Sequence, residues 1–242
     1  MPAQRPDFIG LGTQKGGTTT LHQLLQSHPD VFLPAAKELH YFDQQPDRRP
    51  SWYEQQFERA TANQCCGEIT PFYLFHPAVP ARIHVLLPKV KLIVLLRDPV
   101  ERALSQVFHA RKRGFEPLEP AAAIAAEAER LASGDPVSLQ KHSYVARSRY
   151  LEQLNRYEAL FPPSQLLVLQ SEALFQQPHQ IWDRLQRFLK LASVPLPPLP
   201  VANAGDGGGS RVDPALRAEL RCALATTASG VRERYGFGWN WA

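Results

Sequence analysis

The chain has 242 residues, 44% of them apolar and 21% charged, which is the balance of an ordinary globular protein and excludes the disordered and fibrous classes. No window approaches the roughly 18 consecutive apolar residues that a membrane helix needs, so we expect no membrane span. The formal net charge of +4 is compatible with an anionic ligand, but the basic residues are not interleaved with aromatic ones, so we expect no nucleic-acid partner.

The N-terminal residues 1–6 contain no apolar core, so we predict no secretory signal there and expect this segment to be flexible. The three cysteines, Cys65, Cys66 and Cys222, fit neither a disulfide framework nor a zinc motif. We therefore expect reduced, buried thiols and a cytoplasmic protein.

Short apolar strands alternate with helical stretches along the chain. The predicted strands are Asp7–Gly12, Cys66–Ile69, Lys91–Leu96 and Gln165–Leu169. The predicted helices are Thr18–Ser27, Val79–Leu87, Val100–Arg113, Ala121–Ala132, Arg149–Phe161, Ile181–Leu191 and a last helix from Pro214 to Thr226. This alternation favours an α/β fold with a mostly parallel central sheet flanked by helices on both faces. No repeat or clear boundary interrupts it, so we predict a single domain over residues 1–242.

The segment after the first strand has the composition of a phosphate-binding loop. It reads Gly12-Thr13-Gln14-Lys15-Gly16-Gly17-Thr18-Thr19-Thr20. The glycines let the backbone approach an anion, and the threonines add hydroxyl donors where a helix begins. Gly12 and Gly17 have the spacing of the nucleotide-triphosphate loop, but Thr18 stands in its lysine position and Lys15 is the only lysine of the loop. The alternative is an ordinary glycine-rich turn with threonine caps.

A second candidate anion site follows the strand Lys91–Leu96. Arg97 stands at the end of this strand, and its guanidinium would project into the same crevice as the first loop. Asp98 is a predicted helix cap, and Ser105 lies two turns into the next helix. The alternatives are an ion pair of Arg97 with Asp98 or Glu101 and a solvated Ser105.

Together these segments resemble the sulfotransferases that use 3′-phosphoadenosine-5′-phosphosulfate (PAPS), in particular the heparan-sulfate-type branch and its bacterial relatives. The first resembles the family motif that binds the 5′-phosphosulfate, which assigns this role to Lys15, Gly16, Gly17, Thr18 and Thr19. In the family the lysine contacts the bridging oxygen and stabilises the leaving group. The second resembles the family signature LRDPVERALS, whose arginine and serine hold the 3′-phosphate, and this role carries over to Arg97 and Ser105.

The resemblance implies a P-loop-like sulfotransferase fold and in-line transfer of a sulfuryl group from PAPS to a hydroxyl or amine. The acceptor would be a carbohydrate or a small metabolite, and the other product would be adenosine-3′,5′-bisphosphate. No convergent set of carboxylate, histidine or cysteine ligands is seen in the sequence, so we expect no metal. The acceptor's identity and the oligomeric state are not predicted.

The base that takes the acceptor's proton is sought in the stretch Lys37-Glu38-Leu39-His40-Tyr41-Phe42-Asp43. This stretch resembles the family's Glu-x-His-Phe-Phe-Asp, in which the glutamate is the usual proposed base. We choose Glu38 first and His40 second, with Glu68 as a further alternative. A solvated Glu38 paired with Lys37, or a structural His40, are the competing interpretations.

The sequence departs from the family pattern at three places. Ile69 stands where relatives often carry a lysine that faces the acceptor, and Ser148 replaces a usual glycine before Tyr150. A loose loop at Gly205–Gly209, with Arg211 as the nearby cation, replaces a basic Lys-Gly-Arg loop over the adenine. Two other functions remain as alternatives: a small-molecule kinase or NTPase, which the missing lysine at position 18 disfavours, and a non-catalytic nucleotide-binding module.

Overall fold

A computed structural model describes residues 5–199 and 212–241, which fall into two compact units. The first unit takes residues up to Leu96 together with the segment that starts at Gln153. The second takes Arg97–Glu152 and the C-terminal segment. The predicted loop Gly205–Gly209 and Arg211 lie outside the described residues. The prediction of one domain over the whole chain therefore stays a prediction.

The first unit contains a five-stranded sheet in which every strand pair is parallel, with the order β2-β3-β1-β4-β5. The strands are β1 (Phe8–Gly12), β2 (Val31–Phe32), β3 (Cys65–Ile69), β4 (Lys91–Leu96) and β5 (Leu166–Gln170). Phe8 of β1 lies opposite Gly67 on one side and Lys91 on the other. The predicted α/β class with a parallel sheet is confirmed, and β2, which was not predicted, is the one addition among the described strands.

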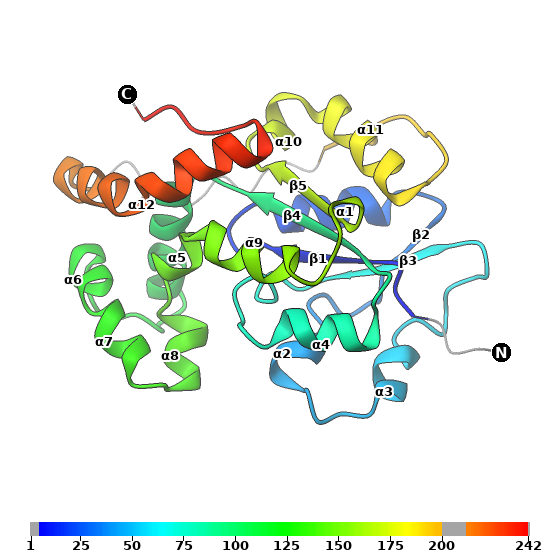
Figure 1. The fold of residues 1–242 in the computed structure, drawn as a ribbon, viewed down its shortest axis with the longest axis horizontal. Helices are drawn as coiled ribbons and strands as arrows, with labels where there is room; N and C mark the ends of the chain where they lie inside the picture. Colours follow the sequence, from blue (N-terminus) through cyan, green and yellow to red (C-terminus); the bar gives the residue numbers. More distant parts are fainter. Residues whose placement is uncertain (1–4, 200–211, 242) are drawn as a thin grey trace. The chain divides into compact units, whose positions relative to one another are not determined.

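Helices of the first unit cover both faces of this sheet (Figure 1). They are α1 (Thr18–Gln26), α2 (Tyr41–Gln44), α3 (Pro50–Gln55), α4 (Val79–Leu86), α10 (Ala173–Gln176) and α11 (Pro178–Leu189). On one face, Leu21 of α1 and Trp182 of α11 pack with Ile93 and Leu95 in one buried cluster. The helices α2, α3 and α4 lie on the other side of the sheet (Figure 1). Both faces of the strands are thus buried, which is why their sequences are continuously apolar.

The second unit is helical. Its elements are α5 (Pro99–Lys112), α6 (Pro120–Ala125), α7 (Glu127–Ala132), α8 (Pro136–Lys141), the short 3₁₀ helix Ala146–Ser148 and α12 (Pro214–Tyr235). The helix α9 (Tyr150–Glu158) carries the boundary between the units. Val100 and Leu104 of α5 pack against Leu216, Leu220 and Leu224 of α12 to form a separate core.

Two predicted helices differ from the structure. The stretch Ala121–Ala132 is helical as predicted, but it divides at Ala126 into α6 and α7, and the buried carboxylate of Glu127 at the start of α7 accepts the backbone N–H groups of residues 145 and 146. The end of the last helix at Thr226 is wrong, because α12 continues to Tyr235 and stops at Gly236, which has φ 75°. Gly230 is kept within this helix because a Cβ there would lie 2.4 Å from a methyl group of Leu151.

One prediction about exposure also fails. Cys222 is an exposed free thiol, not a buried one, because it lies on the outer side of α12 away from the residues that pack against α5. Trp239 near the end of the chain is 7% exposed, and its ring lies 6.3 Å from that of Tyr150.

Candidate functional site

The loop after β1 lies at the edge of the sheet where the parallel strands end. The N–H of Thr13 donates to the carbonyl of Leu95 on β4 over 2.9 Å, and the N–H of Gly16 donates to the carbonyl of Thr13 over 3.0 Å. A Cβ on Gly16 would lie 3.0 Å from that same Leu95 oxygen, so glycine lets the loop fold closely against β4. Gly17 then takes the left-handed conformation, with φ 87°, and caps α1.

The start of α1 offers hydrogen-bond donors to an anion. The first N–H groups of a helix have no acceptor within the helix, and no side chain caps α1 in the described part of the chain. The N–H groups of Thr18, Thr19 and Thr20 therefore remain to bind another acceptor, and the helix dipole adds partial positive charge. This is the set of donors that a phosphate or sulfate group requires.

The backbone is strained at the three residues that the sequence selected as catalytic. Lys15, Glu38 and His40 have φ values of 69°, 62° and 52°. A positive φ is uncommon outside glycine. Within the described residues the fourth non-glycine residue of this kind is Lys190, at the end of α11. Such strain persists where surrounding contacts hold the backbone in place, and it gathers at functional sites.

Lys37, which the sequence suggested only as an ion-pair partner of Glu38, joins the two parts of this site. The ammonium group of Lys37 donates to the hydroxyl of Thr19 over 2.8 Å and lies 3.7 Å from Glu38. On α1, burial and then the neighbouring Lys37 cation lower the pKa of His22. The stretch that carries Glu38 thus lies against the first turn of α1. Since Lys37 and Thr19 are 18 residues apart, no local pattern could have indicated this contact.

His40 lies between two carboxylates. Its Nδ1 lies 2.7 Å from Asp43 Oδ2 and its Nε2 lies 3.6 Å from Glu38 Oε2. Burial alone would lower the pKa of His40, but Asp43 and Glu38 outweigh it and raise this pKa to about 9. The interaction with His40, helped by Lys37, lowers the pKa of Glu38 although partial burial opposes it. At neutral pH the site therefore holds a carboxylate at Glu38 and an imidazolium at His40.

Glu68, the further candidate base, is enclosed within the first unit. It is 2% exposed and accepts hydrogen bonds from Tyr53 (2.7 Å), Thr70 (2.7 Å) and Tyr73 (3.2 Å). Burial raises the pKa of Glu68 to about 7, although these three hydroxyl groups act in the opposite direction. A carboxyl group enclosed in this way cannot contact an acceptor molecule, which favours Glu38 over Glu68 as the base.

The second predicted anion site belongs to the second unit. Asp98 caps α5 as predicted, since it accepts from the N–H groups of Val100 (2.8 Å) and Glu101 (3.1 Å). The hydroxyl of Tyr150 donates to the carbonyl of Arg97 over 2.8 Å and so holds the backbone of that arginine. Ser105 is half-buried on α5. The convergence of Arg97 and Ser105 with the loop of the first unit stays a prediction.

Several side chains near this second site have structural partners. Glu101, one of the acids considered as a partner of Arg97, forms an ion pair with Arg217 of α12. Asp98 also accepts from the indole of Trp241 over 2.7 Å. Ser148 is fully buried and accepts from the buried guanidinium of Arg102 over 2.6 Å, which explains why a serine can stand where relatives have glycine.

Across residues 5–199 and 212–241, no group of three or more histidine, cysteine, aspartate or glutamate side chains could hold a metal ion. No helix in the same described ranges is long and apolar enough to cross a membrane.

A parallel α/β sheet with a glycine-rich loop before a helix defines the class of phosphate-binding α/β proteins. The profile of the family described as "Sulfotransferase domain" matches residues 5–196. Heparan sulfate glucosamine 3-O-sulfotransferase 6 of Mus musculus is 34% identical over 189 residues, which are 78% of this chain and 53% of the relative. The chain belongs to the sulfotransferase domain family, whose members depend on PAPS, and the predicted family, transferase class and family cofactor are confirmed.

Solved structures agree with this assignment. A sulfotransferase from Alicyclobacillus acidocaldarius is similar with a TM-score of 0.82 and 27% identity, over 95% of this chain and 95% of that one. A mouse sulfotransferase, SULT7A1, crystallised with PAP, has a TM-score of 0.56 and 17% identity over 80% of this chain and 61% of that one, which shows the shared fold. The chain spans about half the length of the curated 3-O-sulfotransferase to which it was compared.

Proposed function

We propose that this protein transfers a sulfuryl group from PAPS to a hydroxyl or amine of a carbohydrate or small-metabolite acceptor. The observation that carries the proposal is a contact between residues 37–43, called here the acidic stretch, and the start of α1 after the phosphate loop. Lys37 donates a hydrogen bond to Thr19, and Glu38 lies 3.7 Å from Lys37. The hydrogen-bond donors that would bind the anion and the carboxylate that would act as the base are thereby held side by side within the first unit. An ordinary glycine-rich turn would require no such arrangement.

The loop fits the group that it would hold. Gly16 lies where a Cβ would crowd the backbone of β4, and the first turn of α1 directs its N–H groups outward from a glycine cap. Lys15, Gly16, Gly17, Thr18 and Thr19 would hold the 5′-phosphosulfate, and Arg97 and Ser105 would hold the 3′-phosphate. When bound, PAPS supplies the activated sulfuryl group.

A residue of the acidic stretch would remove the proton from the acceptor's hydroxyl or amine. Glu38, ionised at neutral pH, is the group that accepts this proton, and general bases of this kind contribute about 10²- to 10⁴-fold to a rate. His40, as an imidazolium without a free lone pair, holds Glu38 in place rather than acting as the base. Lys15 would offset the negative charge that develops on the departing oxygen.

The relatives named as heparan sulfate glucosamine 3-O-sulfotransferases support a carbohydrate acceptor. Position 69, where relatives often carry a lysine, holds an isoleucine that is 1% exposed and packs in the buried cluster with Leu21 and Ile93. It therefore does not distinguish an acidic saccharide acceptor from a neutral one.

The proposal is tested by calorimetric binding of adenosine-3′,5′-bisphosphate, ADP and Mg-ATP to the wild type, Arg97→Ala and a matched control, Arg113→Ala. We expect the wild type and the control to bind adenosine-3′,5′-bisphosphate at least about tenfold more tightly than ADP, because a phosphate–arginine pair contributes about 1.5–3 kcal/mol. Arg97→Ala should lose this preference. Equal or tighter binding of Mg-ATP would instead favour the kinase alternative.

Turnover separates an enzyme from a binding module. Glu38→Gln should keep the affinity for adenosine-3′,5′-bisphosphate and lose sulfuryl transfer by about 10²-fold or more, measured with labelled PAPS and a panel of saccharides. Binding by the wild type without transfer to any acceptor would favour the non-catalytic module.

A further inference from the structure

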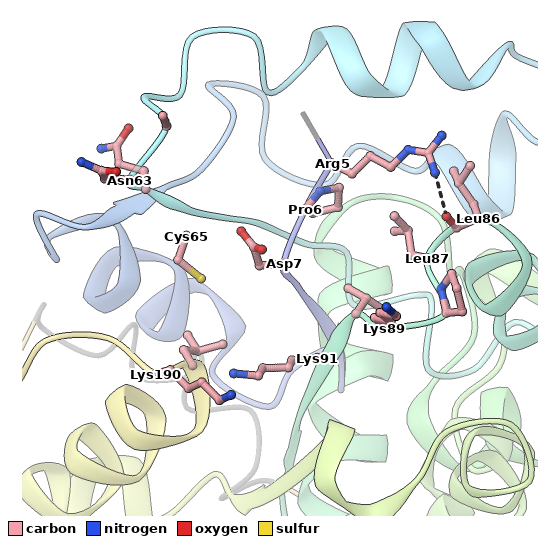
Figure 2. Close-up of a pocket in the computed structure, with 15 residues that line it drawn as sticks. Arg5, Pro6, Asp7, Asn63, Cys65, Leu86, Leu87, Lys89, Lys91 and Lys190 are labelled. Atoms are coloured by element: carbon pink, nitrogen blue, oxygen red, sulfur yellow. Dashed lines mark hydrogen bonds between the residues drawn. The ribbon is translucent and has the colours of Figure 1, made fainter. Parts of the chain in front are cut away.

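A pocket of about 610 Å³ opens in the first unit at the edge of the sheet where the strands begin. Its walls come from Arg5–Asp7 before β1, residues 62–65 before and at the start of β3, residues 86–91 before β4, and Lys190 at the end of α11 (Figure 2). The phosphate loop follows the other end of β1, and five residues of extended strand span about 16 Å. The pocket is therefore separate from the site described above.

The charge of this pocket is strongly unbalanced. Four of its side chains are cations, namely Arg5, Lys89, Lys91 and Lys190, and one is an acid, Asp7. Arg5 forms an ion pair with Glu54 over 2.8 Å. The three lysines form no ion pair with any residue of the described ranges 5–199 and 212–241.

Two of these cations face one another. Figure 2 shows the ammonium groups of Lys91 and Lys190 pointing toward the same space, with Asp7 and Cys65 beside it. Burial and then the charge of Lys190 lower the pKa of Lys91, so the two ammonium groups repel each other across the pocket. Lys91 keeps one hydrogen bond, to the carbonyl of Phe188 over 2.6 Å, which fixes its position at the end of α11.

Asp7 opposes the repulsion by raising the pKa of Lys91, but the three lysines outnumber this one carboxylate, and an oxyanion would balance the remaining positive charge. The pocket's volume lies in the range of small-molecule sites. Asp7, whose carboxylate is oriented by the N–H of Cys66 over 2.8 Å, adds an acceptor suited to a hydroxyl group.

We propose that this pocket is a second anion site, in which Lys91, Lys190 and Lys89 bind one sulfate, phosphate or carboxylate group of a small hydroxylated ligand. It lies apart from the phosphate loop and does not depend on the reaction proposed above. A free oxyanion and a sulfated or phosphorylated sugar share this chemistry, and the experiment below separates them.

The chain has seven lysines, so side-chain NMR of ¹³C-lysine-labelled full-length protein can follow each one. Inorganic sulfate is titrated against sodium chloride at equal ionic strength, and glucosamine 6-sulfate is titrated in a second arm. We expect saturable shifts of the Lys91 and Lys190 signals with sulfate but not with chloride. Tighter binding of the sugar sulfate identifies a hydroxylated ligand, whereas equal binding identifies the free ion.

Variants decide whether the pocket is the site. Lys190→Asn should weaken sulfate binding at least tenfold while leaving the Lys91–Phe188 hydrogen bond intact, and asparagine tolerates the positive φ of 61° at this position. Lys91→Met should do the same, and Lys112→Met, with the same loss of charge outside the pocket, should bind as the wild type does. Linear or chloride-like shifts, or unchanged affinity in Lys190→Asn, would overturn the proposal. The signals of Lys15 and Lys37 report binding at the phosphate loop separately. A lack of binding at the loop can therefore be distinguished from a lack of binding in the pocket.

Discussion

The charge state of a single histidine has a consequence for the pH dependence of transfer. His40 is protonated below a pKa of about 9, because Asp43 and Glu38 hold its imidazolium in spite of burial. We expect kcat/KM for the acceptor to fall as the pH rises through about 9, since the loss of this proton removes the partner of Glu38. The two groups form a partly exposed ion pair at 3.6 Å, and such pairs are worth about 0.2–1 kcal/mol, which corresponds to a decrease of up to about fivefold.

The variant His40→Gln serves as the test in a pH–rate profile between pH 6 and 10.5. It should be up to about fivefold slower than the wild type near pH 7 and should lack the decrease near pH 9, because glutamine does not titrate. Any decrease from the lysines, whose ordinary pKa is about 10.4, should persist in both proteins. A decrease near pH 9 that remains unchanged in His40→Gln would show that His40 is not the group responsible.

At this residue scale, the sequence could nominate candidate site residues but not show how they are held. The resemblance selected Lys15, Glu38 and His40, and these are three of the four non-glycine residues with positive φ in the described ranges. The role of Lys37 depends on its contact with Thr19 across 18 residues of chain, and the role of Asp43 depends on its complete burial. Such contacts are set by tertiary packing, which residue spacing does not encode.

Among the elements, α5 depends on one cap. Asp98 satisfies two N–H groups of the first turn and also binds the indole of Trp241. Asp98→Ala should lower the free energy of unfolding by about 1–2 kcal/mol, the usual cost of losing a helix N-cap. Asp98→Asn should cost only a few tenths, because asparagine caps equally well. Urea unfolding of both variants measures the difference.

A second capped helix supplies the comparison. Asp135 caps α8 in the same way, through the N–H groups of Val137 and Ser138, but has no indole partner. Asp135→Ala should therefore cost no more than Asp98→Ala. If Asp98→Ala and Asp98→Asn were equally stable, the cap would not contribute to the stability of α5.

Element boundaries followed from the sequence where the apolar pattern is clear, as for α1, α4 and β4. They failed where a distant contact decides. The strand β2 has two residues and is defined only by its register with Cys65 and Cys66. The helix α12 contains Gly230 because Leu151 packs so closely on it that a side chain would not fit there. Helix α2 begins at Tyr41, directly after the strained N-cap residue His40, which no propensity would select as a helix cap.

At the scale of the whole molecule, alternation of apolar strands with helices was enough to predict the parallel α/β class, because a sheet buried on both faces needs continuous apolar strands. Alternation could not predict the basic pocket at the opposite edge of the sheet. Its charges come from three separate segments, and in the sequence alone none of Lys89, Lys91 and Lys190 differs from an ordinary surface cation.

The buried carboxyl group of Glu68 makes the stability of the fold depend on pH. Burial raises its pKa from 4.5 to about 7 in the folded protein, so folding favours the protonated form. The stability that protonation contributes is fully present below pH 4.5 and is lost as the pH rises through about 7. A shift of this size corresponds to about 3 kcal/mol.

Glu68→Gln has nearly the same shape, can still accept from Tyr53 and Thr70, and cannot titrate. The unfolding free energy of the variant minus that of the wild type should therefore increase by about 3 kcal/mol between pH 4.5 and 8. Urea unfolding at five pH values measures this difference, in which all other titrating groups cancel, and Glu58→Gln at an exposed position serves as the matched control. A flat line for Glu68→Gln would mean that this carboxyl group is ionised in the folded protein over the whole range, held by its three hydroxyl donors.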